Sequence, residues 1–267
     1  MNKEENYLEI NKNSWNQKTK FHLKSEFYDV PSFLKGKSSL NQTELDLLGN
    51  VKGKKILHLQ CHFGQDSISL ARMGAEVTAI DLSDKAIEAG KDLAKQTNTE
   101  VRFICCDVYD LPNHLDEKFD IIYTSYGTIG WLPDLDKWAK VISHFLKPNG
   151  EFVFVEFHPV VWMFDDDFKG VNYPYSSKEA IIESYEGTYA DKNADLDAEY
   201  VMWNHGIDVV LSSLLQNDLE LKSFEEFNYS HYDCFRHTVE FEPNKYRIEK
   251  FGDKIPMMYS IKAIKKA

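Results

Sequence analysis

Residues 55–81 read KILHLQCHFGQDSISLARMGAEVTAID. Two short apolar runs, 55–61 and 76–81, stand at the ends of this stretch, and a turn containing Gly64 opens the helical pattern between them. Short apolar runs bounded by polar or turn residues are typical of buried strands. The stretch therefore predicts a strand, a turn, a helix and a second strand, and such a unit implies a right-handed crossover between parallel strands.

The same alternation continues beyond this stretch. Further apolar runs at 101–107, 119–125 and 151–158 have the composition of strands, and helical patterns lie between them at 84–96 and 134–146. Strands that alternate with helices favour a parallel sheet that is covered on both faces. We therefore predict a doubly wound, Rossmann-like α/β fold.

The C-terminal part adds a helical pattern at 206–216 and two more strands at 219–227 and 257–264. Together with the earlier runs they predict a seven-stranded, mostly parallel sheet. We expect a single domain over 1–267, with four parts: an N-terminal helical cap (1–50), a core that binds a ligand (51–158), a lid-like insertion rich in aromatic residues after the fifth strand (159–203), and the C-terminal part of the core sheet (204–267).

Composition limits the function classes. The chain has 267 residues, of which 43% are hydrophobic and 13% aromatic, so it can fill a sizeable core. It carries 31 basic and 43 acidic side chains, for a net charge of −12. Nucleic-acid binding depends on basic side chains that neutralise phosphates, so we expect no nucleic-acid partner. Because the N-terminal residues are polar and no long apolar run occurs, we expect a cytoplasmic protein with no membrane partner.

The cysteines and histidines suggest no metal site. Cys61, Cys105, Cys106 and Cys234 form no CxxC pair, and apolar neighbours favour buried, inert thiols at the first three. His58 and His62 are four positions apart, but on a segment that passes from strand to turn this spacing does not converge on a metal ion. We therefore predict no metal.

Polar residues follow three of the predicted strands. Gly64, after the first strand, permits close approach of a ligand to the backbone at a helix N-terminus. Asp81 ends the second strand, where its carboxylate can accept both hydroxyls of a ribose, although it can also contribute to the cap of the next helix beside Ser83. At the end of the third strand, Asp107 can accept from an adenine amine while the Val108 N–H donates to the ring. Since ligands collect at the carboxyl ends of parallel strands, these positions together predict an adenosine pocket.

These motifs resemble those of the class I S-adenosylmethionine-dependent methyltransferases. The resemblance is close over 51–158 and rests on VTAIDLS (77–83), FICCDVYDLP (103–112), FDIIYTSYGTIGWLPDLDKW (119–138) and LKPNGEFVFVE (146–156). SEFYDV (25–30) and HLQCHFGQDSISLAR (58–72) are similar to a bacterial subgroup of small-molecule methyltransferases. The chain departs from the family at the first strand, where His58 replaces an acidic residue and Gln60 and His62 replace glycines.

The resemblance implies S-adenosylmethionine as the cofactor and an in-line transfer of its methyl group to a small molecule. By position it assigns the ribose to Asp81, the adenine to Asp107 and Val108, the methionine part to the turn 59–64, and the surroundings of the reacting methyl to Thr124, Ser125 and Tyr126. The full expected set of cofactor-binding residues is His58, Gln60, Cys61, His62, Gly64, Asp81, Leu82, Asp107, Val108, Thr124, Ser125 and Tyr126.

The catalytic residue and the reaction class have alternatives. If the acceptor needs a base, His22, Tyr28 and His158 are candidates, because they lie in or beside segments expected to cap the pocket. An NAD(P)-dependent oxidoreductase shares the strand, the turn and the aspartate at its second strand, but normally has a fuller glycine pattern. A nucleoside-binding protein without catalytic activity is the other alternative. The sequence does not identify the acceptor or the oligomeric state.

Overall fold

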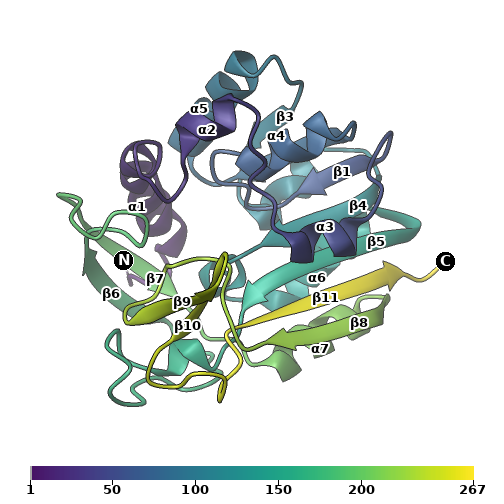
Figure 1. Ribbon diagram of the computed structural model, residues 1–267. Helices are drawn as coiled ribbons and strands as arrows, with labels where there is room; N and C mark the ends of the chain where they lie inside the picture. The colour runs from purple at the N-terminus through teal and green to yellow at the C-terminus, as the bar shows by residue number, and fades with distance from the viewer. Residues whose placement is uncertain (1) are drawn as a thin grey trace.

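Seven strands form one sheet in the order β3–β2–β1–β4–β5–β11–β8 in the computed structural model, which describes residues 2–267 (Figure 1). Strand β11 runs antiparallel to β5 and β8, and the other neighbouring pairs are parallel. This confirms the predicted doubly wound, mostly parallel sheet. The strands are β1 (Lys55–His58), β2 (Glu76–Asp81), β3 (Arg102–Cys105), β4 (Phe119–Ser125), β5 (Leu146–Phe157), β8 (Leu219–Phe227) and β11 (Met258–Lys265).

Helices cover both faces of this sheet. One face packs against α6 and α7, and the other against α3, α4 and α5. The helices are α1 (Tyr7–His22), α2 (Val30–Leu34), α3 (Gln42–Leu48), α4 (Gln65–Arg72), α5 (Asp84–Gln96), α6 (Leu135–Phe145) and α7 (Ile207–Gln216), with short 3-10 turns at Val108–Asn113, Ile129–Trp131 and Val161–Met163. None of the helices within residues 2–267 is long and apolar enough to cross a membrane.

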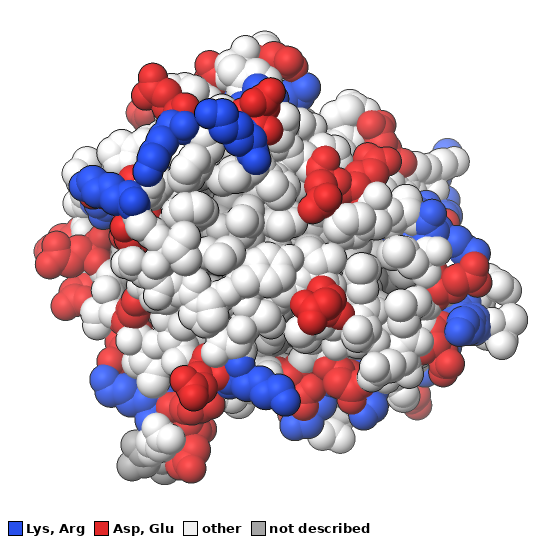
Figure 2. Space-filling model, turned by 90° about the horizontal axis from the view of Figure 1, so that it is seen from below, with Lys and Arg blue, Asp and Glu red and all other residues white. Residues whose placement is uncertain are grey.

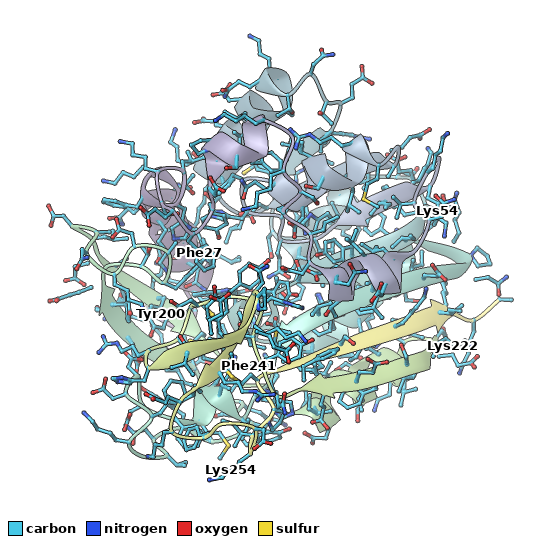
Figure 3. All side chains as sticks on the ribbon, viewed as in Figure 1. Phe27, Lys54, Tyr200, Lys222, Phe241 and Lys254 are labelled. Carbon is cyan, nitrogen blue, oxygen red and sulfur yellow. The ribbon has the colours of Figure 1, made fainter. Side chains whose placement is uncertain are left out.

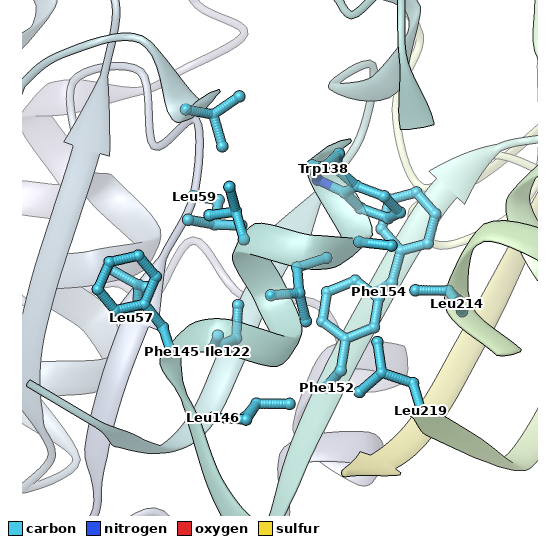
Figure 4. Packing of buried hydrophobic residues seen from close by; sticks show 14 of the residues in the cluster. Leu57, Leu59, Ile122, Trp138, Phe145, Leu146, Phe152, Phe154, Leu214 and Leu219 are labelled. Carbon is cyan, nitrogen blue, oxygen red and sulfur yellow. The ribbon is translucent and has the colours of Figure 1, made fainter. Parts of the chain in front are cut away.

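The largest apolar cluster lies between the sheet and α6 and α7 (Figure 4). Trp138 of α6 is fully buried and its ring contacts Phe152 and Phe154 of β5 edge to face, with centroids 5.4 and 5.5 Å apart. Close packing of this kind holds the central strands in one register. It thereby fixes where the carboxyl ends of β1, β4 and β5 stand.

Most predicted elements occur near the expected positions, and the differences are at their ends. The predicted spans of β2, α5, β4 and β8 are reproduced as expected. Strand β1 ends at His58 rather than residue 61, because Gln60 and His62 adopt positive φ angles of 53° and 51° that leave the extended conformation. Helix α6 stops at Phe145, before the Pro148–Gly150 stretch expected to end it.

Two hairpins lie outside the main sheet. β6 (Ile181–Glu186) pairs with β7 (Asp197–Met202) in the expected insertion after β5. β9 (Thr238–Glu242) pairs with β10 (Lys245–Ile248), between β8 and β11. The second hairpin corrects the expectation that all of 204–267 belongs to the core sheet. In Figure 1 both hairpins stand on the same side of the main sheet as the N-terminal helix α1.

The thiols differ from expectation at one position. Cys61 and Cys106 are buried as predicted, but Cys105 is exposed. Cys105 ends β3, which is the edge strand of the sheet, so no further strand covers this end. The prediction of a buried thiol at Cys105 was therefore wrong.

Candidate functional site

A large cavity of about 1170 Å³ opens at the carboxyl ends of β1, β2, β3 and β4, where the strand order reverses. This is the place at which open α/β sheets bind ligands. All of the predicted cofactor-binding residues except Thr124 line it: His58, Gln60, Cys61, His62, Gly64, Asp81, Leu82, Asp107, Val108, Ser125 and Tyr126. Thr124 is fully buried and donates its hydroxyl to the Leu59 carbonyl at 3.2 Å, so it supports β1 from behind.

The turn between β1 and α4 forms the floor of the cavity. Gly64 has a φ of 71°, and a Cβ there would lie 2.5 Å from the Phe103 ring, so this position requires glycine. Gln60 and His62 also adopt left-handed conformations, with φ angles of 53° and 51°. These two positions therefore keep a backbone that suits glycine while carrying side chains, at a cost in backbone strain.

Asp81 binds the backbone of the turn and the start of α5. Its carboxylate accepts the His62 N–H and the Ser83 N–H, each at 2.8 Å. Ser83 itself caps α5, since its hydroxyl accepts the Ala86 N–H at 3.0 Å. Burial raises the pKa of Asp81 to about 6, against backbone hydrogen bonds that lower it. Asp81 thus holds the turn in place and still presents carboxylate oxygen to the cavity that it lines.

Asp107 lies at the end of the neighbouring strand β3 and lines the same cavity. Burial raises its pKa above the usual range, while nearby backbone N–H groups of Tyr109 and Val108 act in the opposite direction. The structure therefore brings Asp81 and Asp107 to one wall of one cavity. Their predicted separate contacts, to a sugar and to a purine, require this arrangement.

The opposite wall is the segment that follows β4. Glu156 of β5 is buried and accepts hydrogen bonds from backbone N–H groups of Thr128 at 2.7 Å and Ile129 at 3.3 Å, and also from that of Gly127. Gln60 reaches across and donates its Nε2 to the Thr128 carbonyl at 2.8 Å. The other side-chain atom of Gln60, Oε1, is buried without a hydrogen-bond partner in the structure. It is a free acceptor next to the floor of the cavity.

Of the three candidate bases, only Tyr28 lines the cavity. Its hydroxyl contacts that of Tyr189, and burial raises its pKa well above the usual range, so it keeps its proton. His22 lies behind His62, with their ring nitrogens 2.9 Å apart, and burial strongly lowers its pKa. His158 is 2.9 Å from a Glu226 carboxylate oxygen and does not reach the cavity. Neither histidine reaches the cavity, and Tyr28, which lines it, keeps its proton, so none of the three stands at the cavity as a base.

Helix α1 supplies lining residues that sequence reasoning missed. Tyr7, Asn11, Trp15 and Lys18 line the cavity from one face of the helix, at spacings of four, four and three residues. This helical spacing is the sequence feature from which the lining face of α1 could have been predicted. It was missed because an inward helix face is normally recognised by apolar residues, and this one contains charged and polar residues.

Lys18 is the unusual member of this face. It is 7% exposed, and its Nζ lies 5.0 Å from the Trp15 ring centroid, 5.3 Å from that of Trp131 and 5.7 Å from that of Tyr200. Burial lowers its pKa to about 8. Figure 3 labels Tyr200 on β7, together with Phe27 from the segment after α1, and both residues line the cavity.

Acidic and hydroxyl groups gather at the end of the cavity beyond Ser125. Asp66 accepts the Ser39 hydroxyl at 2.6 Å, the Tyr123 hydroxyl at 3.3 Å and the Ser125 hydroxyl at 3.4 Å. Burial raises the pKa of Asp66 above its usual range. On the other side of the floor, burial lowers the pKa of His58 to about 3, and this residue shares a 2.7 Å hydrogen bond with Ser67. Position 58 is therefore neutral and cannot replace an acidic residue as an anion.

The distribution of charge on the outer surface bears on the expected absence of a nucleic-acid partner. Figure 2 shows a face with a broad uncharged area, around which basic and acidic side chains are interspersed. Binding to a nucleic-acid backbone uses a continuous basic area. The expectation of no nucleic-acid partner stays a prediction.

The cavity fits a nucleoside that carries a zwitterionic end. Its lining includes two carboxylates at the strand ends, the Gln60 Oε1 without a hydrogen-bond partner, and the buried cation of Lys18. By contrast, no group of three or more potential metal ligands exists within residues 2–267.

Comparison with known proteins agrees with this geometry. Residues 56–150 match the family model described as a methyltransferase domain. The fold resembles the structure of an S-adenosylmethionine-dependent methyltransferase from Mesorhizobium loti, with a TM-score of 0.58 and 19% identity over 87% of this chain and 100% of the other. Residues 56–150 form a class I methyltransferase domain. The fold of this chain also resembles that of geranyl diphosphate C-methyltransferase from Streptomyces coelicolor, with a TM-score of 0.57 and 16% identity over 84% of this chain and 77% of that one.

Curated relatives match only part of the chain. A ubiquinone biosynthesis O-methyltransferase of Coxiella burnetii is 33% identical over 104 residues, which are 39% of this chain and 44% of the relative. The match thus spans less than half the length of that relative. The family of the domain follows from these comparisons, and the acceptor of the methyl group does not.

Proposed function

We propose that the protein transfers the methyl group of S-adenosylmethionine to a small-molecule acceptor. The observation that carries the proposal is the joint position of Asp81 and Asp107 on one wall of the cavity, above a turn that belongs to a methyltransferase domain. In solved relatives of the same fold, the geranyl diphosphate enzyme was crystallised with S-adenosyl-L-homocysteine. The cytoplasmic location and the single-domain organisation expected from the sequence stay predictions.

When bound, the sulfonium cofactor supplies an activated methyl group, and the chain supplies position and electrostatics. Asp81 accepts hydroxyls of the ribose, and Asp107 accepts the adenine amine. Ser125 and Tyr126, at the end of β4, border the region between the nucleoside and the acidic end of the cavity. The acceptor is expected there, since the two carboxylates occupy the other side.

Aromatic side chains from the N-terminal segment, the insertion and the segments after β4 and β8 cover this region. Tyr28 contacts Tyr189 through their hydroxyls, and the Tyr126 ring stands edge to face on Tyr232 at 4.9 Å. Such a cover excludes water and presents flat apolar surface to the acceptor. A small, partly apolar acceptor therefore fits better than a polymer.

Isothermal titration calorimetry with S-adenosylhomocysteine and with NADH tests the proposal. We expect S-adenosylhomocysteine to bind and NADH not to bind. Asp81→Ala should weaken S-adenosylhomocysteine at least about 100-fold, because two charge-assisted hydrogen bonds are lost. Asp84→Ala is the matched control, since Asp84 lies close by on α5 but pairs with Lys12 on the surface. Tight NADH binding alone, or equal affinity in Asp81→Ala, contradicts the proposal.

Formation of S-adenosylhomocysteine from S-adenosylmethionine over a panel of hydroxyl, amine and carbon acceptors tests turnover. We expect product with at least one small acceptor. Binding of the cofactor without turnover on every member would favour the nucleoside-binding protein that lacks catalytic activity.

A further inference from the structure

We propose that Lys18 of α1, together with Gln60, binds the α-amino acid end of the cofactor, with the Lys18 ammonium on its carboxylate. This inference rests on the proposed function and adds a subsite to it. The first-strand turn of this chain has lost the acidic residue and two of the glycines expected in the family, so its amino acid subsite must be built differently. The starting point is a buried cation with no anion beside it.

Lys18 is buried yet unpaired. Among the described residues, it forms no ion pair with an acidic side chain and no hydrogen bond, and burial alone accounts for the lowering of its pKa. The nearby Tyr200 hydroxyl donates to Glu183 at 2.9 Å, so that carboxylate is engaged on the far side of the ring. A buried ammonium is costly unless it is paired. The rings of Trp15, Trp131 and Tyr200 offset only part of that cost.

Lys18 also differs from the other cations that line the cavity. Lys37, Lys192 and Arg236 are exposed, and Lys37 and Arg236 pair with acidic side chains. Only Lys18 is both buried and part of the wall. An anion that enters the cavity therefore finds one desolvated cation, where electrostatic attraction is stronger than at the surface.

The position of Lys18 indicates that this anion is the carboxylate of the cofactor. Trp15 packs on His62 with ring centroids 5.1 Å apart and on Trp131 at 5.3 Å, so this face of α1 lies over the turn and over the segment after β4. The backbone N–H of His62 is bound by Asp81. A group attached to a ribose on Asp81 would continue over residues 60–62, beneath Lys18.

Gln60 supplies the second half of the proposed subsite, which is an acceptor for the ammonium group. Its Oε1 is buried and has no hydrogen-bond partner, while its Nε2 is fixed on the Thr128 carbonyl at 2.8 Å. The fixed Nε2 leaves the amide oxygen oriented as an acceptor. One free acceptor for an ammonium and one free cation for a carboxylate match the two charges of an α-amino acid.

Calorimetry with two nucleosides tests the subsite. S-adenosylhomocysteine carries the amino acid end, and 5′-methylthioadenosine has the same adenosine and a thioether but lacks it. Lys18→Met keeps the apolar stem and removes the charge. We expect this variant to weaken S-adenosylhomocysteine about tenfold or more and to change 5′-methylthioadenosine less than about twofold. Lys18→Arg should retain most of the affinity, and Lys20→Met, on the exposed side of α1, should change neither.

The outcomes separate this inference from the proposed function. If Lys18→Met weakens both nucleosides equally, or neither, the subsite is overturned, because the charge then serves the fold or another ligand. If wild-type protein binds the two nucleosides equally well, the subsite is also overturned while the adenosine pocket stands. If neither nucleoside binds, the proposed function itself fails. Far-ultraviolet circular dichroism and thermal melting of each variant show whether it folds.

A second variant checks the acceptor half of the subsite. Gln60→Leu removes the amide oxygen and keeps a side chain of similar size. We expect it to weaken S-adenosylhomocysteine and to leave 5′-methylthioadenosine within about twofold. Equal loss for both nucleosides would show that Gln60 acts only by holding the Thr128 segment.

Discussion

Asp81 shows how one carboxylate can organise both the protein and its ligand. Its oxygens accept the His62 and Ser83 N–H groups, and it still lines the cavity. The sequence offered the cap of α5 and the ribose as alternative partners. In the structure Ser83 is the N-cap of α5, since its hydroxyl accepts the Ala86 N–H. Asp81 therefore fixes the turn without serving as the cap of α5, and its contact with a ribose stays a proposal.

The titration of Asp81 predicts a pH dependence of binding. Burial raises its pKa to about 6, so it is ionised at pH 7 and becomes protonated as the pH falls through 6. A protonated carboxyl accepts two hydroxyls poorly, so the affinity for 5′-methylthioadenosine should fall below about pH 6. Calorimetry between pH 5 and 8 measures this. Asp81→Asn should bind weakly and nearly independently of pH, and an equally steep fall in that variant would assign the titration to another group.

The same titration acts in the opposite direction on the free protein. A carboxyl whose pKa is higher in the folded than in the unfolded state binds protons preferentially when folded. Its contribution to stability is therefore present at low pH and lost as the pH rises through about 6. Burial also raises the pKa of Asp66 and that of Glu44, the latter to about 7, so these groups act in the same direction.

Single residues at strand ends could be predicted, and residues placed by packing could not. Asp81 and Asp107 follow apolar runs, and the edge to which parallel strands bring them is a general rule. Lys18 reaches the site only because α1 lies between α5 and the β6–β7 hairpin, which is a tertiary fact. Asp66 lies in the first turn of α4 and was not predicted as a site residue. The sequence around it does not indicate that Ser39 and Tyr123 are its hydrogen-bond partners.

At the scale of elements, the turn between β1 and α4 predicts a large effect at Gly64. Gly64→Ala combines a left-handed backbone, which costs about 1–2 kcal/mol, with overpacking against Phe103, which costs about 1–3 kcal/mol. We expect the free energy of unfolding to fall by about 2–5 kcal/mol. Gly53→Ala is the control, since its φ is 73° but nothing lies within 4 Å of the added Cβ. Urea denaturation of both variants should separate the clash from the strain, and equal losses would argue against the clash.

The segment after β4 depends on one carboxylate, and Glu156→Gln tests this. An amide has one acceptor oxygen fewer and sets an NH₂ group against the N–H groups of Gly127, Thr128 and Ile129. We expect a loss of about 2–4 kcal/mol in the free energy of unfolding, because a buried charged network is broken. Glu220→Gln, on the surface of β8, should leave denaturation essentially unchanged. A stable Glu156→Gln variant would show that the segment holds itself in place.

The elements themselves followed from periodicity, except where the chain leaves the sheet. Helix α5 and strands β2 and β4 have strong apolar patterns and were predicted to the residue. The β9–β10 hairpin was missed, because β9 is mostly exposed and β10 is largely half-buried, so neither strand has a buried face that imposes alternation. Its neighbours Tyr232 and Phe235, which line the cavity, were missed with it.

At the scale of the whole molecule, four distant parts of the chain enclose one ligand, and hydrogen exchange should report this. Binding of S-adenosylhomocysteine should slow amide exchange together in α1, in the turn 59–64, in the segment 127–131 and around Tyr189. Helix α7, which packs on the opposite face of the sheet, is the internal control and should not change. Protection limited to the turn would show that α1 and the insertion do not close on the ligand.

The side chains at positions 60 and 62 have a consequence for the size of donor that the site admits. A floor made of glycines leaves room beneath a ligand, whereas Gln60 and His62 fill that room from a left-handed backbone that glycine adopts freely. Replacing His62 by glycine would relax the chain and hollow the floor. The added space would lie at the turn 59–64, which is expected under the methionine part of the cofactor, so the variant would accept cofactor analogues with a bulkier amino acid end.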